Sequence, residues 1–90
     1  MRDELQRASE SLRRAAEVTD DEDLEGRIYD QSRELATLAT ADEGPDHGRL
    51  ARHVHTFRDL AADADDPDAE RAIEEAVDAV QRYREGVEGV

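Results

Sequence analysis

The sequence predicts an all-α fold, a small antiparallel up-and-down bundle of four helices. Apolar residues recur every three or four positions along the whole chain, and no stretch alternates with the period of two that a strand requires. Short segments rich in Asp, Gly and Pro interrupt these stripes, as expected for tight connections between neighbouring antiparallel helices. With 90 residues, the chain has the size of a single domain, residues 1–90.

The first half of the chain predicts two helices separated by an acidic break. We expect the first helix over about residues 2–18, and an apolar stripe out of phase with it marks the second helix. Thr19 and Glu22 lie at the mismatch and fit a capping box. A three-helix fold with the first two segments fused is the alternative. The second stripe consists of Leu24, Ile28, Gln31, Leu35 and Leu38.

The second half predicts two further helices after a loop at residues 41–48, because Gly44-Pro45 cannot continue a helix. The third helix is expected to end near Asp65. Asp66 then supplies an N-cap and Pro67 the first helical residue of the fourth helix. The sequence shows no evident internal repeat. The apolar faces of these two helices comprise Leu50, Val54, Phe57 and Leu60, followed by Ala69, Ile73, Ala76, Val77, Val80, Tyr83 and Val87.

The charge of the chain predicts an environment more clearly than a reaction. Twenty-five Asp and Glu residues stand against twelve Arg residues, without any Lys, and the formal net charge is −13. An acidic coat of this density is typical of proteins adapted to concentrated salt, and it argues against nucleic acid and anionic membranes as partners. The chain has no Cys, no apolar run of about eighteen residues and an N-terminus unlike a signal peptide. We therefore expect a soluble, cytoplasmic protein.

Candidate chemistry is sparse. On a helix, His53 and His55 project about 200° apart and cannot chelate one ion together. We expect His53 beside Phe57 and His55 paired with Asp59. A small-ligand or metal site using the loop histidine, His47, with the nearby histidines is the alternative function. Serine, carboxylate and glycine patterns match no catalytic or phosphate-binding motif, so we predict no enzyme, no catalytic residue and no cofactor.

A protein-interaction function is the leading hypothesis from sequence. The core material is thin, because Ala supplies many of the apolar positions, and an uncovered apolar stripe would favour self-association or a homodimer. Gln31 is an unusual amide on a predicted inner face, where it needs a hydrogen-bond partner and can fix helix register. The alternative is that Gln31 lies at the solvent-exposed margin of the stripe. The interface residues predicted from the edges of the stripes are Tyr29, Tyr83 and Val87.

Three stretches carry a family resemblance, namely residues 5–16, 44–53 and 83–90. The first stretch is the opening heptad pattern from Leu5 to Ala16. The second reads Gly-Pro-Asp-His-Gly-Arg-Leu-Ala-Arg-His, and the third reads Tyr-Arg-Glu-Gly-Val-Glu-Gly-Val. Together they resemble a family of small, uncharacterised helical proteins from haloarchaea. The resemblance implies a cytoplasmic, salt-adapted helical domain and no assigned activity or functional residue.

Overall fold

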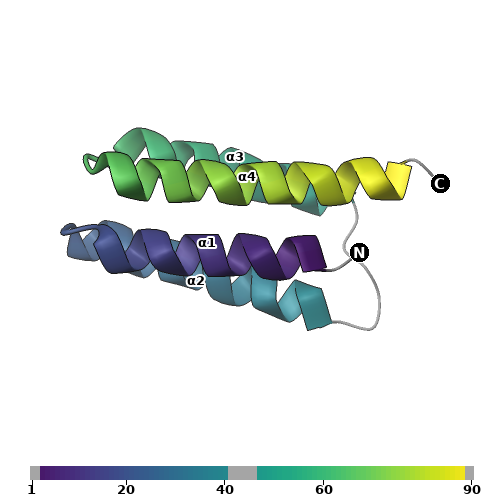
Figure 1. Ribbon diagram of the computed structural model, residues 1–90, viewed down its shortest axis with the longest axis horizontal. Coiled ribbons are helices and arrows are strands. Elements are labelled where there is room, and N and C mark those ends of the chain that lie inside the picture. The colour runs from purple at the N-terminus through teal and green to yellow at the C-terminus, as the bar shows by residue number, and fades with distance from the viewer. Residues whose placement is uncertain (1–2, 41–46, 89–90) are drawn as a thin grey trace.

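The four predicted helices are present as separate elements. The computed structural model describes residues 3–40 and 47–88, without the side chains of residues 47 and 86–88. Within these residues it contains no strand, and the first two helices are not fused. The order along the chain is α1 (Asp3–Val18), α2 (Glu22–Thr40), α3 (His47–Asp63) and α4 (Pro67–Glu88) (Figure 1).

Aspartates cap α2 and α4 in the same way. Asp21 Oδ1 accepts hydrogen bonds from the second and third backbone N–H groups after it, at 3.0 and 3.1 Å. Asp66 does the same at 2.8 and 3.4 Å, with Pro67 in the first helical position as predicted. The predicted capping box at Thr19 is therefore wrong. Thr19 Oγ1 instead accepts from the backbone N–H of Asp21, inside the turn.

The boundaries of α3 also differ from the prediction. This helix begins at His47, so the predicted loop over residues 41–48 extends two residues too far. It ends at Asp63 rather than near Asp65, because the connection to α4 needs residues 64–66 for its turn and cap. Gly44, Pro45 and the predicted cap residue Asp46 lie outside the described residues.

The apolar stripes of all four helices face one core, as predicted. Leu35, Phe57 and Val80 are fully buried, and Val54 retains only 5% exposure. Among the described residues, the only large apolar side chains with substantial exposure are Val18 and Tyr29, each 42% exposed. The expected uncovered stripe is therefore not found in the described part of the chain, because each stripe packs against the other helices.

The helices form two hairpins that pack side by side in a bundle 40 Å long and 19 by 18 Å across. One hairpin consists of α1 and α2 and the other of α3 and α4, with the successive helices running in alternating directions (Figure 1). The hairpins meet mainly where α1 lies along α4. The contact between α2 and α3 is much smaller.

The two hairpins repeat one another with an offset of 45 residues, which corrects the expectation of no internal repeat. Eleven of the 45 matched positions carry the same residue. Ten of the twelve buried residues in the first hairpin have a buried counterpart 45 positions later, and the other two counterparts are half-buried. The identical pairs are Leu5/Leu50, Arg7/Arg52, Arg13/Arg58, Ala16/Ala61, Asp20/Asp65, Asp21/Asp66, Asp23/Asp68, Glu25/Glu70, Ile28/Ile73, Glu43/Glu88 and Gly44/Gly89.

Candidate functional site

The interface between α1 and α4 is built from small side chains. Ser11, Ala72 and Ala79 lie along an edge of this interface, on either side of Arg14 and Glu75. Helical spacing places further alanines in the same two rows. Because none of these side chains extends beyond a hydroxymethyl group, the two helix axes can approach closely. The rows are Ala8, Ser11 and Ala15 on α1, and Ala72, Ala76 and Ala79 on α4, all of them buried.

The repeat assigns the matching rows to the interface between α2 and α3, where the residues are larger and mostly polar. An approximate two-fold relation exchanges α1 with α3 and α4 with α2, so the two interfaces would be equivalent if the side chains matched. They do not match, and the interface with the larger residues is the one where the two helices make less contact. The rows here are Arg27, Gln31 and Glu34 on α2, and His53, Thr56 and Leu60 on α3.

A hydrogen bond between Gln31 and His53 joins the two helices of this α2–α3 interface. His53 Nδ1 lies 2.8 Å from Gln31 Oε1, and because the amide oxygen can only accept, Nδ1 carries the proton. His53 is 9% exposed, and its ring centre lies 6.0 Å from that of Phe57, which confirms the expected position beside Phe57. Gln31 thus finds a partner on the opposite hairpin, while its side chain stays partly exposed to solvent.

Burial disfavours the charged form of the same histidine. Burial lowers the pKa of His53 below its ordinary value of 6.5, because the charged imidazolium loses hydration. The nearby Glu34 carboxylate opposes this shift, and Arg49 and Arg52 add to it.

A second polar contact also spans α2 and α3. It is an ion pair with 3.2 Å between Arg27 Nη1 and Asp63 Oδ2.

An open groove of about 530 Å³ lies beside this interface, the α2–α3 groove. Its wall contains the ion pair between Arg33 and Asp30, with 3.1 Å between Nη2 and Oδ1. Acidic and basic side chains are equally represented, so the groove has no strong preference for one sign of charge. Its lining residues are Asp30, Gln31, Arg33, Glu34, Thr37 and Arg49.

A second groove, of about 490 Å³, runs along the outside of the other hairpin, between α3 and α4. We call it the α3–α4 groove. Ala61, Ala62 and Val77 supply its apolar surface, and three carboxylates against one guanidinium surround that surface. A groove of this kind can take an apolar side chain next to a basic one. The charged lining residues are Arg58, Glu70, Glu74 and Asp78.

The structure separates the candidate histidines. The predicted pairing of His55 with Asp59 is confirmed, with 3.7 Å between Nε2 and Oδ2 on an exposed face. His53 faces Gln31 instead, and the side chain of His47 lies outside the described residues. No group of three or more potential metal ligands occurs among the residues that were described. Metal binding at the loop of His47 thus stays a prediction.

The three predicted interface residues differ in their exposure to solvent. Tyr29 is exposed on α2, whereas Tyr83 is 6% exposed and belongs to the core. Val87 is in α4, but its side chain lies outside the description. Sequence reasoning missed the α3–α4 groove. Its small residues Ala61 and Ala62 were the available signal, because alanines beside an apolar stripe leave room between two helices.

Together these observations define an up-and-down four-helix bundle made of two matched hairpins. No helix in the described ranges is both long and apolar enough to cross a membrane. The chain belongs to the family of unknown function DUF7553, whose sequence model matches residues 1–86. The search of curated proteins and the search of solved structures found no match. The resemblance to an uncharacterised family of small helical proteins therefore agrees with the family found.

Proposed function

We propose that this protein is a salt-adapted, non-enzymatic interaction module that binds another protein chain through the α3–α4 groove. The observation that carries the proposal is the composition of the groove. It presents the apolar side chains of Ala61, Ala62 and Val77 within a largely acidic boundary, on an outward side of the bundle. A concave surface with an apolar centre and a polar rim has the anatomy of a small protein-binding site.

The groove favours a segment that carries an apolar or aromatic side chain next to an Arg. The apolar side chain covers Val77 and the two alanines and releases water from them. Glu70, Glu74 and Asp78 then lie close enough to pair with a guanidinium, which binds carboxylates with its planar fork. The acidic boundary disfavours nucleic acid and anionic membranes at the same position, so both remain excluded from the proposal.

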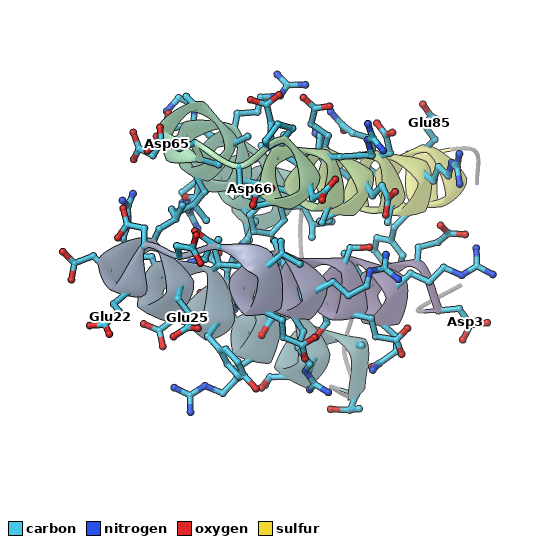
Figure 2. All side chains as sticks on the ribbon, turned by 60° about the vertical axis from the view of Figure 1, so that its left-hand side comes forward. Asp3, Glu22, Glu25, Asp65, Asp66 and Glu85 are labelled. Atoms are coloured by element: carbon cyan, nitrogen blue, oxygen red, sulfur yellow. The ribbon has the colours of Figure 1, made fainter. Side chains whose placement is uncertain are left out.

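Adaptation to salt is the second part of the proposal. Every described Asp and Glu side chain is exposed except Glu4 and Asp66, which are half-buried. Figure 2 shows labelled carboxylates directed outward at both ends of the bundle. In dilute buffer these like charges repel one another, whereas at about 1 M salt the screening length falls to about 3 Å. A cytoplasm rich in salt, such as that of haloarchaea, is the setting that we propose.

Circular dichroism tests the salt adaptation directly. We expect helicity and melting temperature to fall when molar KCl is replaced by dilute buffer, because the screening of carboxylate repulsion is lost. Equal helicity and equal melting temperature in both buffers would contradict this part of the proposal.

Site-directed photocrosslinking tests the groove. A benzophenone amino acid replaces Glu74 in the groove or, as the control, His55 on the exposed side of the same hairpin, in native host cells at native salt. We expect a discrete protein adduct from position 74 and none from position 55. The adduct should disappear when Glu70→Arg and Asp78→Arg reverse the acidic boundary. No adduct at position 74, or one that survives the reversal, would refute this function.

A further inference from the structure

Tyr29 occupies the position on one hairpin that Glu74 occupies on the other. The offset of 45 residues aligns the two positions, and Glu74 lines the α3–α4 groove. Tyr29 is 42% exposed, which makes it one of two large apolar side chains with substantial exposure in the described chain. One hairpin therefore presents an aromatic side chain at the place where the other hairpin presents a groove.

One charge beside Tyr29 also differs between the matched positions. Arg33, one helical turn after Tyr29, corresponds to Asp78, which lines the α3–α4 groove. One hairpin therefore carries a guanidinium next to its exposed aromatic side chain, and the other carries a carboxylate next to its apolar groove. At this position the two sides of the molecule have opposite charges.

We infer that the occupant of the α3–α4 groove is a second copy of this chain, which inserts Tyr29 and places Arg33 against Glu74 and Asp78. This inference rests on the proposed function of the groove and names its partner. The phenol ring supplies the apolar side chain that Ala61 and Val77 can cover. The guanidinium of Arg33 supplies the opposite charge that the boundary of the groove requires.

The ion pair that Arg33 already forms does not prevent Arg33 from pairing with a second copy of the chain. Arg33 pairs with Asp30 at 3.1 Å, and the two side chains are 74% and 68% exposed. A surface pair of this kind contributes about 0–1 kcal/mol, and less in concentrated salt. Arg33 can thus change partner at small cost, while the burial of Tyr29 adds an apolar contribution that salt does not screen.

The contact joins unlike surfaces, because the two hairpins form opposite sides of the bundle (Figure 1). Each copy can offer Tyr29 to one neighbour and its groove to another, so the interface is heterologous and generates rings or linear assemblies. A net charge of −13 on every copy opposes the approach in dilute buffer. Association should therefore strengthen with protein concentration and with salt.

Mixing two defective variants tests this arrangement. Tyr29→Glu removes the aromatic side chain but keeps the groove, and Glu74→Arg impairs the groove but keeps Tyr29. Both positions are exposed, so the fold should persist, which circular dichroism checks. In molar KCl we expect wild type to form concentration-dependent oligomers by sedimentation velocity, and each variant alone to remain monomeric. An equimolar mixture should form heterodimers, while the control His55→Glu should behave as wild type.

Several outcomes would overturn the inference. A monomeric wild type at high concentration, a single variant that still oligomerises, or a mixture that stays monomeric would each do so. Crosslinking from position 74 separates this failure from that of the proposed function. Adducts with another protein but never with a second copy refute the inference alone, whereas the absence of any adduct refutes both.

Discussion

The α1–α4 and α2–α3 interfaces occupy equivalent places in the repeat but differ in chemistry. At the centre of the first, Ala8 and Ala76 are both fully buried. The matching residues of the second are His53 and Gln31, which are joined by a hydrogen bond of 2.8 Å. Small apolar residues allow close packing along a whole helix, whereas larger polar residues join two helices at separate points. In this bundle, two interfaces at equivalent places in the repeat differ in packing, and the more extensive contact is the one lined by small side chains.

The largest expected effect on stability comes from placing in the α1–α4 interface the glutamine that the α2–α3 interface has at the matching position. Ala76→Gln inserts a long amide among Ala8, Ser11 and Ala15, where it overfills the space and lacks a matched partner. We expect the free energy of unfolding to fall by about 3 kcal/mol. Chemical denaturation in molar KCl measures this change. Ala36→Gln, at a half-buried position on α2, is the control and should cost much less. Equal losses would contradict the comparison.

A double-mutant cycle across the α2–α3 interface should give the next largest effect. Gln31→Ala leaves the buried imidazole of His53 without its acceptor, and His53→Ala leaves the amide without its donor. The double variant has alanine at both positions, as the α1–α4 interface has at the matching positions. We therefore expect a coupling of about 1 kcal/mol, with the double variant less destabilised than the sum of the singles. Strict additivity in equilibrium unfolding would show that the hydrogen bond contributes no stability.

The pH dependence of stability should also distinguish the two interfaces. Burial lowers the pKa of His53 in the folded state, so the unfolded chain binds more protons as the pH falls below 6.5. Stability should be retained above that pH and decline below it as the pH approaches the lowered pKa of the folded state. Thermal melts at constant KCl measure the slope, and His53→Gln should flatten it. An unchanged slope in this variant would exclude His53 as the cause.

The smallest effect is expected from the exposed ion pairs that cross each interface. Arg14 Nη2 lies 2.9 Å from Glu75 Oε2 across α1 and α4, and Arg27 pairs with Asp63 across α2 and α3. Because these side chains are between 52% and 62% exposed, Arg14→Ala and Arg27→Ala should each cost about 0–1 kcal/mol. Chemical denaturation in molar KCl should reveal almost no difference between the two. A large loss for Arg27→Ala would mean that the α2–α3 interface depends on that pair.

The candidate site was only partly predictable from sequence. Tyr29 was predicted as an interface residue because an aromatic at the edge of a stripe is visible in the periodicity, and the structure shows that it is exposed. The partner of Gln31 was not, because His53 lies 22 residues away and on another helix. The α3–α4 groove was missed although Ala61 and Ala62 lie beside an apolar stripe. Those alanines indicate room beside α3, but the groove also needs Val77, which only the packing of α3 against α4 brings next to them.

The internal repeat was hidden in the sequence for a different reason. Only eleven of the 45 matched positions are identical, and five of these pairs lie between Asp20/Asp65 and Ile28/Ile73, a segment dominated by acids. An excess of acidic residues makes such matches common throughout the chain. The buried pattern separates the repeat from this compositional background, because it compares the environment of each residue rather than its type.

The sequence by itself determined the helices, the Asp66 cap and the apolar faces, since these depend on residues within one or two turns of each other. It also determined the strongly acidic charge of the chain. The tertiary structure alone decided that α1 packs closely along α4, that α2 and α3 remain apart, and that Tyr83 belongs to the core. These outcomes depend on the sizes of side chains brought together from distant positions, and such sizes act only after the helices have met.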